Sequence, residues 1–340
     1  MRSVGLLPAL AVLLVACGAD TPPQAPPPVT PDEPATTETD GPLVIAAPAG
    51  GRALTDVIDA WRQESGERAR LVSVDTPERK EADLFVSDSV GDIWSLAEDD
   101  ELRPVSSAVV NQNIDVTLRD SESRWVGIST RARIVAYNEA AVTPEELASV
   151  GTYASLRDER WLGRLCLSSS RSGGNRMVIA QLIREHGVRE AEMIVRGWRA
   201  NLATTVYADD DALLAAIAAG DCAIGIAGSN RIFAIPGSSA VGAHWFEPPA
   251  TTVIDAAVLG ISRHATDADG AQRLLEWLTT PTANALFAIG RLDLPANSNA
   301  TIATAISDLP VDRGSASAPL SELAFLLEEA DLLRQRAGYP

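Results

Sequence analysis

The sequence predicts an α/β protein whose sheets are mostly parallel and which is divided into two lobes. Short apolar segments alternate with amphipathic ones from Leu43 onward, and this alternation is typical of parallel α/β folds. The part that can fold is about 300 residues long, which is more than one hydrophobic core usually serves.

The expected strands are short apolar runs that end in polar or glycine-containing loops. They are residues 43–49, 69–75, 82–87, 125–130, 132–138, 164–170, 222–228 and 256–263. We treat 125–130 and 132–138 as two strands around a polar joint.

The expected helices carry apolar residues at helical spacing, as in Leu54, Val57, Ile58 and Trp61. Thr143 followed by Pro144 indicates a helix start, and Gly187 indicates a helix end. The helices are residues 53–65, 90–102, 144–150, 176–187, 188–202, 210–220, 269–280, 281–290 and 320–338.

The first residues resemble a bacterial lipoprotein signal. One arginine precedes a short apolar run, and Leu14-Val-Ala-Cys17 matches a lipobox, which implies cleavage before Cys17 and acylation of that residue. An ordinary signal peptide with an incidental cysteine is the alternative. Gly18 resembles the pattern that permits export to the outer membrane. Residues 17–41, rich in proline and acidic side chains, predict an extended tether.

The formal net charge of −18 argues against binding to nucleic acid or to an anionic membrane surface. It does not exclude an anionic ligand, because a few buried arginines can set the local field. Besides Cys17 there are two cysteines, Cys166 and Cys222. In an exported protein such a pair favours a disulfide, with two buried free thiols as the alternative.

Motifs for catalysis are missing from the sequence. It has no G-x-S-x-G, P-loop or G-x-G-x-x-G, and His186, His244 and His264 lack the spacing of metal ligands. Residues 209–211 are three aspartates that could bind a cation, but the N-cap and first-turn charge of the helix that follows is the better interpretation. We therefore expect a protein that is not an enzyme.

Several segments together resemble the periplasmic ferric-iron-binding proteins of bacterial ABC importers. They are "SRWVGISTRARIVAYNEAAVTPEEL", "LRDERWLGRLCLSSS", "VREAEMIVRGWRANLA" and "DDDALLAAIAAGDCAIGIAG". The likeness runs from about residue 43 to 300, and the branch with cysteines at the positions of Cys166 and Cys222 is the most similar. It implies a type 2 periplasmic binding protein: two α/β lobes joined by two crossing strands, with the ligand between the lobes.

The resemblance also implies domain boundaries. Residues 1–16 would be the signal peptide and 17–41 the tether. Residues 42–132 and 250–303 would form lobe 1, and residues 133–249 and 304–340 would form lobe 2.

The tyrosines with which that family holds ferric iron have no counterpart at the positions we can match. Asn230 and Arg231 stand in place of a tyrosine pair, and Gly174 in place of a third tyrosine. We therefore expect no metal and no cofactor, with ferric iron unfavoured. The competing hypothesis is a metal site built from Tyr137, Tyr153, Tyr207 or Tyr339.

The replaced positions predict a site for an anion. Serine hydroxyls, glycine N–H groups and arginines are donors that suit carboxylates or phosphates. Arg131 resembles the anion-facing arginine of the family, and Arg133 ranks second. The expected ligand residues are Arg231, Asn230, Ser229, Arg171, Ser170, Gly174, Asn175, Arg131, Gly50, Gly51 and Ser87.

The sequence thus predicts a solute-binding protein that is anchored in the periplasm by a lipid on the inner or outer membrane. It would bind a small anionic or polar ligand as a monomer and pass it to an ABC permease. A ferric-iron binder and a sensory or interaction lipoprotein are the two alternatives.

Overall fold

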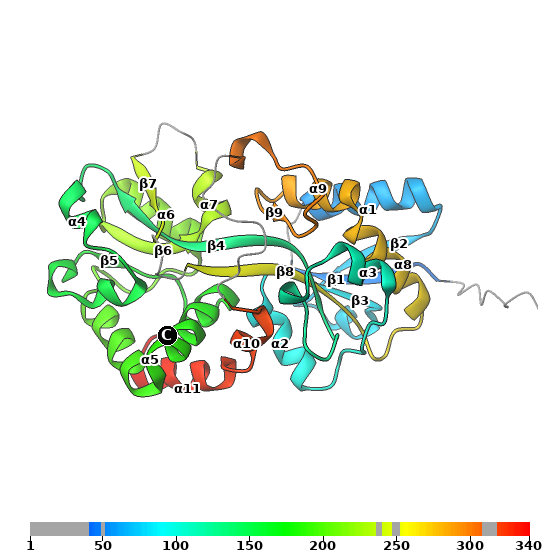
Figure 1. The fold of residues 1–340 in the computed structure, drawn as a ribbon, viewed down its shortest axis with the longest axis horizontal. Helices are drawn as coiled ribbons and strands as arrows, with labels where there is room; N and C mark the ends of the chain where they lie inside the picture. Colours follow the sequence, from blue (N-terminus) through cyan, green and yellow to red (C-terminus); the bar gives the residue numbers. More distant parts are fainter. Residues whose placement is uncertain (1–40, 49–51, 236–239, 247–251, 308–317) are drawn as a thin grey trace, which may run out of the picture. The chain divides into compact units, whose positions relative to one another are not determined.

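A computed structural model describes residues 41–48, 52–235, 240–246, 252–307 and 318–340. Residues 39–340 form one unit. Figure 1 shows the order of the elements along the chain. Cys17, Gly50 and Gly51 lie outside the described residues, so their predicted roles stay predictions.

The strands are those expected from the apolar runs, with two additions, β7 and β9. They are β1 (Leu43–Ala47), β2 (Ala69–Ser73), β3 (Leu84–Ser87), β4 (Val126–Asn138), β5 (Leu165–Cys166), β6 (Ile224–Gly228), β7 (Val241–His244), β8 (Val253–Ile261) and β9 (Leu294–Pro295).

The α-helices keep the expected order, but those at residues 108–113 and 229–233 were not expected, and the helix expected at residues 320–338 is divided in two. They are α1 (Arg52–Ser65), α2 (Val90–Glu98), α3 (Ala108–Asn113), α4 (Pro144–Ala148), α5 (Gly173–Ala200), α6 (Asp210–Ala219), α7 (Ser229–Phe233), α8 (Ala268–Thr279), α9 (Pro281–Ile289), α10 (Leu320–Ala324) and α11 (Leu327–Ala337). Short 3-10 helices are formed by Pro77–Glu81, Val116–Leu118, Tyr153–Arg157, Glu159–Trp161 and Thr304–Ile306.

One sheet connects all the strands that the structure describes, in the order β2-β1-β3-β8-β4-β6-β5, with β7 and β9 also paired to β4. Its outer pairs, β1 with β2 and β3, and β5 with β6, are parallel. The central pairs are antiparallel, so the sheet is more mixed than the sequence indicated. We call the part with β1–β3 the first half of the sheet and the part with β5 and β6 the second half.

Strand β4 joins the two halves. Its first part pairs with β8 and β9, and its second part pairs with β6 and β7. Figure 1 shows β4 and β8 running side by side between the two groups of elements. The two strands expected here are therefore one. Arg131, at the expected joint, pairs regularly with Asp255 of β8, and a bulge lies earlier, at Gly127–Ser129.

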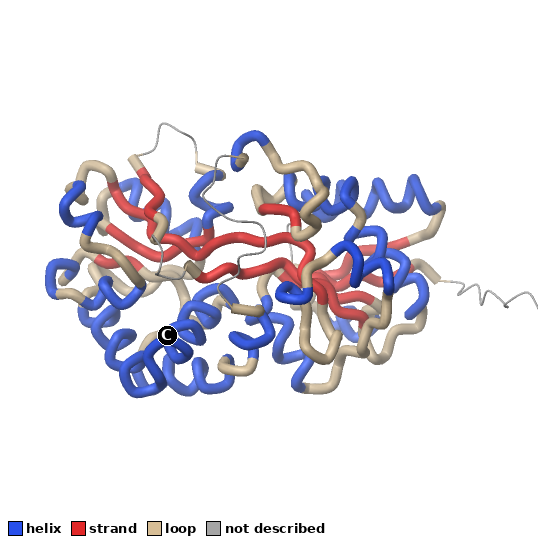
Figure 2. The backbone as a smooth tube through the Cα atoms, in the orientation of Figure 1, coloured by secondary structure: helices blue, strands red, loops and turns tan. Residues whose placement is uncertain are grey.

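Helices cover both faces of the sheet (Figure 2). Local signals set their ends as expected: Thr143 and Glu146 form a capping box at α4, and Gly220 ends α6 in the left-handed conformation. The expected break at Gly187 is a kink inside α5, where φ is 75°. The large side chains of Trp61, Trp125, Trp161 and Trp198 are almost completely buried.

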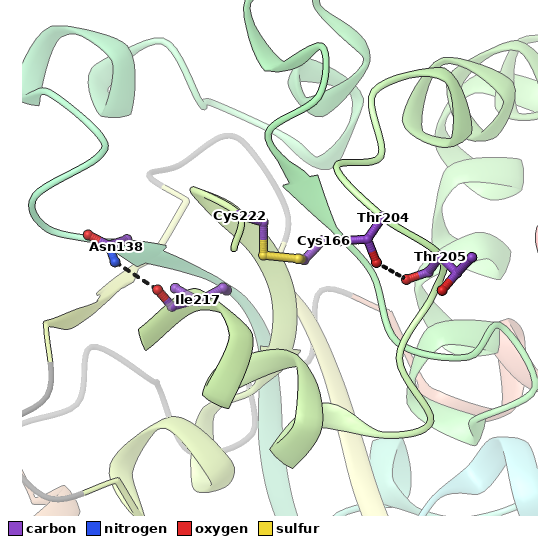
Figure 3. Close-up of a disulfide and its surroundings, with 6 residues drawn as sticks. All are labelled: Asn138, Cys166, Thr204, Thr205, Ile217 and Cys222. Atoms are coloured by element: carbon purple, nitrogen blue, oxygen red, sulfur yellow. Dashed lines mark hydrogen bonds between the residues drawn. A yellow bond between two sulfur atoms is a disulfide. The ribbon is translucent and has the colours of Figure 1, made fainter. Parts of the chain in front are cut away.

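The predicted disulfide is present between Cys166 and Cys222, with the Cα atoms 5.9 Å apart. Cys166 lies on β5 beside Gly225 of β6, and Cys222 lies just before β6 (Figure 3). Asn138 Nδ2 at the end of β4 donates a 2.7 Å hydrogen bond to the Ile217 carbonyl of α6. The bridge therefore stabilises the second half of the sheet beneath the loops that follow β5 and β6.

Candidate functional site

Two of the predicted loops meet at the amino ends of α2 and α5. Ser89 caps α2 and Ser172 caps α5 with their side chains. A Cβ atom placed on Gly91 would lie 2.6 Å from the Gly173 carbonyl oxygen, so a side chain at Gly91 would not fit. The loop after β3 in the first half of the sheet therefore contacts the loop after β5 in the second half.

The loop after β6 contacts the first half at a different point. Asn230 Nδ2 donates to the carbonyl oxygen of Arg291, at 3.4 Å. Ser229 is buried, and its hydroxyl accepts from the Ala132 N–H on β4. Arg231 is exposed and pairs with Asp211 at 2.7 Å. Asn230 thus lies at a contact between the two halves, Arg231 pairs within the second half, and Ser229 helps to hold that loop on β4.

The loop after β5 has one exposed cation and a buried interior. Arg171 is exposed, and within the described part of the chain its side chain has no partner. Ser170 is completely buried, and its hydroxyl donates to the Tyr339 carbonyl at 2.8 Å. The side chain of Asn175 is buried and donates to Ser168 and Ser169. Ser170 and Asn175 therefore shape the loop, while Arg171 faces solvent.

The guanidinium group of Arg131 is occupied by groups of the protein. Its Nε and Nη2 donate to the two carboxylate oxygens of Asp293, at 2.9 and 2.6 Å, and its Nη1 donates to the Asp88 carbonyl. Burial alone would lower the pKa of Arg131, but Asp293 raises it above its usual value. Arg131 is thus a charged residue that joins segments of the chain.

Arg133 has the same kind of partner in the second half of the sheet. Its Nη1 lies 2.5 Å from Asp210 Oδ2, and its Nη2 donates to Asn175 Oδ1 at 2.7 Å. A Cβ atom on Gly174 would lie only 3.2 Å from Arg133 Nε. Any larger residue at position 174, a tyrosine included, would therefore press on this guanidinium.

Asp210 connects both loops of the second half. Its carboxylate accepts from the Ser168 hydroxyl at 2.8 Å and from the Gly228 N–H at 2.9 Å, besides Arg133. Burial would raise the pKa of Asp210, but Arg133 lowers it, so the carboxylate stays ionised. The neighbouring aspartates act separately, because Asp209 caps α6 and Asp211 pairs with Arg231. The interpretation of these aspartates as the N-cap and first-turn charge of a helix is confirmed, because Asp210 and Asp211 lie in the first turn of α6.

Two further carboxylates lie near the contact of α2 with α5. Asp255 on β8 is buried and accepts from the N–H groups of Val90 and Ala256, and burial raises its pKa. Asp92 is exposed as a residue, but its carboxyl group points at the Gly173 N–H. Desolvation there, together with the charge of Asp255, raises the pKa of Asp92 to about 7.

The four tyrosines differ in their surroundings. Tyr153 and Tyr339 are buried and donate to the carbonyls of Arg133 and Ser168, and burial raises the pKa of both phenols. Tyr137 and Tyr207 are half-buried. Among the described residues, no group of three or more His, Cys, Asp or Glu side chains has the arrangement of a metal site.

Ser87 is buried, and its hydroxyl donates to the Ser89 carbonyl at 3.0 Å, so it stabilises the turn into α2. The roles of the predicted residues as ligand contacts remain predictions.

No helix in the described parts is long and apolar enough to cross a membrane.

Sequence reasoning did not find Asp293 or Arg291, and it named Tyr339 only as a possible metal ligand. A signal existed for Asp293, since a carboxylate between Leu292 and Leu294 is unusual in an apolar stretch and requires a cation when buried. Arg291 pairs with Asp88 at 2.5 Å and with Asp293 at 3.3 Å. For Tyr339 no local signal existed, because its contacts come from a loop far away in the sequence.

Comparison with known proteins places this geometry among transport proteins. The family described as bacterial extracellular solute-binding protein matches residues 63–310. Iron uptake protein A1 of Synechocystis sp. is 24% identical over 294 residues, which cover 84% of this chain and 79% of that protein.

Solved structures agree with this similarity. A Trichodesmium protein, described as IdiA or FutA in complex with iron and citrate ligands, has 27% identity and a TM-score of 0.77, covering 88% of this chain and all of that one. The ferric binding protein of Campylobacter jejuni has a TM-score of 0.80 at 18% identity, with the same coverage.

These comparisons confirm two expectations and correct a third. The resemblance to ferric-iron-binding proteins is confirmed, and so is the two-lobed, type 2 periplasmic binding protein fold. The expectation of no metal and no cofactor, with ferric iron unfavoured, is wrong, because similar proteins are described as binding iron. It rested on missing tyrosines and on the lack of a histidine or carboxylate placed to replace them, but carboxylates that accompany the metal can also be its ligands.

Proposed function

The chain belongs to the bacterial extracellular solute-binding proteins and serves an ABC importer outside the cytoplasm, and from this premise we propose that its ligand is ferric iron in a complex with a small carboxylate such as citrate. Proteins of this kind deliver their ligand to a membrane permease. The proposed complex is anionic and therefore meets the earlier expectation of an anionic ligand.

The observation that carries this proposal is the excess of donors around the loops after β5 and β6. Arg171 has no side-chain partner in the described part of the chain, and Arg231 is paired only with an exposed aspartate. Asn230 adds a neutral donor, because its Nδ2 carries two hydrogens and donates one of them to the Arg291 carbonyl. Such groups suit the carboxylates of a chelate, since arginine can donate to a carboxylate through two N–H groups at once.

The buried phenols support the same conclusion. Tyr153 and Tyr339 stay protonated, because burial raises the pKa of each and their hydroxyls already donate to carbonyl groups. Neither phenol is then available as an anionic oxygen. The carboxylates that travel with the iron would supply such oxygens, which a hard cation prefers.

Equilibrium dialysis with ferric citrate, and with citrate alone, tests the proposal. The wild type should retain iron and citrate together. Arg171→Ala and Arg231→Ala should each weaken the binding by about 1.5–3 kcal/mol, the range for hydrogen bonds to charged groups. Arg263→Ala is the matched control, because Arg263 is also an exposed arginine paired with an aspartate, Asp100. Retention of iron without citrate, or no retention at all, would contradict the proposal.

We further propose that the mature protein is a monomer without enzymatic activity, anchored through a lipid on Cys17. The division into lobes at residues 132–133, 249–250 and 303–304 belongs to the same proposal. Mass spectrometry of the mature amino terminus tests the anchor, and a cleaved but unmodified terminus would contradict it.

A further inference from the structure

The end of the chain contacts the loop after β5. The Ser170 N–H donates to the Pro340 carbonyl at 2.9 Å, and the Ser170 hydroxyl donates to the Tyr339 carbonyl at 2.8 Å. Tyr339 is only 3% exposed, and its hydroxyl donates to the Ser168 carbonyl at 2.7 Å. Residues 339–340, which we call the tail, therefore pair with a loop about 170 positions earlier.

Tyr339 also belongs to a buried polar network that reaches the loop after β6. Its hydroxyl oxygen accepts from Asn175 Nδ2 at 3.3 Å, and Asn175 Oδ1 accepts from Arg133. Arg133 in turn pairs with Asp210, which holds the Gly228 N–H at the end of β6. A single phenol hydroxyl is thus linked through three side chains to both loops that we assign to the ligand.

The tail is held in place by the helix before it. Ala330, Leu333 and Ala337 of α11 are buried, and Figure 1 shows α11 lying along α5. Gly338 ends α11 with a φ of 69°, which turns the chain toward the loop. Asp331 on α11 also pairs with Arg176 of α5 at 2.7 Å. The packing of α11 on α5 therefore fixes the position of Tyr339.

We propose that Tyr339 is a positioning residue for ligand binding: its hydroxyl donates to Ser168 and accepts from Asn175, so that the loop of residues 168–175 presents Arg171 in one arrangement. This inference rests on the proposed function. Tyr339 itself is not a ligand, because its hydroxyl is used within the protein both as donor and as acceptor.

The test compares Tyr339→Phe with Tyr137→Phe. Both substitutions remove one hydroxyl and keep the ring, but the Tyr137 hydroxyl has no hydrogen bond within the described residues and packs beside Gly242 of β7. Tyr339→Phe loses the hydrogen bonds to Ser168 and from Asn175, and it should weaken ferric citrate binding roughly threefold to tenfold through the loop that they position. Tyr137→Phe should leave the affinity unchanged, and the melting temperatures of the two unliganded variants should agree.

Hydrogen exchange supplies the local measurement. In unliganded Tyr339→Phe, exchange should rise in peptides that cover residues 168–175 and stay unchanged in peptides of β1–β3. Ser170→Ala, which removes a different contact of the tail, should act in the same direction with a smaller effect. A merely structural role would raise exchange throughout the second half of the sheet and lower the melting temperature.

The outcomes separate this inference from the proposed function. If the wild type binds ferric citrate and Tyr339→Phe binds equally well, the inference is wrong and the proposed function stands. If the wild type binds none, the proposed function is wrong, and hydrogen exchange alone decides whether Tyr339 positions the loop. Unchanged exchange at residues 168–175 would overturn the inference in either case.

Discussion

Arg131 and Arg133 lie two residues apart on one face of β4, yet their partners differ in kind. Arg131 donates to Asp293, which is completely buried and also pairs with Arg291. Arg133 donates to Asp210 and Asn175, and these two side chains hold the loops after β5 and β6. The first arginine thus belongs to a pair within the crossing region, and the second belongs to a network that reaches the candidate site.

The difference shows that two buried arginines on one face of a strand can hold different parts of the molecule. Both arginines resembled anion-binding residues in the sequence, and both are neutralised by carboxylates of the chain itself. The two arginines differ in the other groups to which their partner carboxylates, Asp293 and Asp210, are hydrogen-bonded. Asp293 accepts from Ser129 on β4, whereas Asp210 accepts from Ser168 and from the backbone of the loop after β6.

The largest effect is expected from Asp293→Ala. This change leaves Arg131 buried without its main partner, and removing one member of a buried pair costs about 3–5 kcal/mol of unfolding free energy. Urea denaturation measures the loss. Glu67→Ala is the matched control, since Glu67 pairs with Arg273 on the surface at 2.7 Å, and its removal should cost less than about 1 kcal/mol. Equal losses in the two variants would show that Arg131 does not depend on Asp293.

Asp210→Ala should lower the free energy of unfolding less than Asp293→Ala does, but it should weaken ligand binding more. Asp210 is slightly exposed, so water can partly solvate Arg133, and we expect a loss of roughly 2–3 kcal/mol. The affinity of the folded protein for ferric citrate should fall further than in Asp293→Ala, because both ligand loops lose an anchor. If Asp293→Ala weakens binding as much as Asp210→Ala does, the distinction between the two arginines fails.

Features with local causes could be predicted from the sequence. The order of strands and helices follows from apolar spacing, and the kink at Gly187 and the cap at Thr143 follow from single residues. The disulfide followed from two cysteines in an exported protein. Each signal lies within a few residues of the feature that it produces.

Features that depend on distant partners could not be predicted. The polar sequence Thr130-Arg131 suggested a joint between two strands, but Asp293 neutralises Arg131 from 162 positions away, so β4 continues through it. Tyr339 contacts Ser168 from a similar distance in the sequence. The expectation about iron failed for a related reason. A small molecule that chelates the metal can supply ligands that the protein sequence does not contain.

The smallest expected effect concerns Asp92, whose pKa depends on the charges of the groups near the two arginines. The buried carboxylates of Asp293 and Asp255 and the slightly exposed one of Asp210 lie close to Arg131 and Arg133. Asp255 is the one that no arginine holds through a hydrogen bond among the described residues, and its charge reaches Asp92 on α2. Asp88 adds to this repulsion, and Arg176 opposes it.

Because the pKa of Asp92 is raised from 3.8 to about 7 in the folded protein, the folded state binds a proton there that the unfolded state has released. Stability from this group is therefore fully present below pH 4 and is lost as the pH rises toward 7. Asp92 is exposed as a residue, so solvent screening limits the effect to about 1 kcal/mol.

Asp92→Asn keeps an acceptor for the Gly173 N–H and removes the titration. The variant should be more stable than the wild type at pH 8 and equal to it at pH 4, as measured by urea denaturation at both values. Asp99→Asn, an exposed change just after the same helix, should show no such difference. If Asp92→Asn is less stable than the wild type at pH 8, the ionised carboxylate stabilises the start of α5. In that case the attraction of Arg176 for the ionised Asp92 would outweigh the repulsion from Asp255 and Asp88.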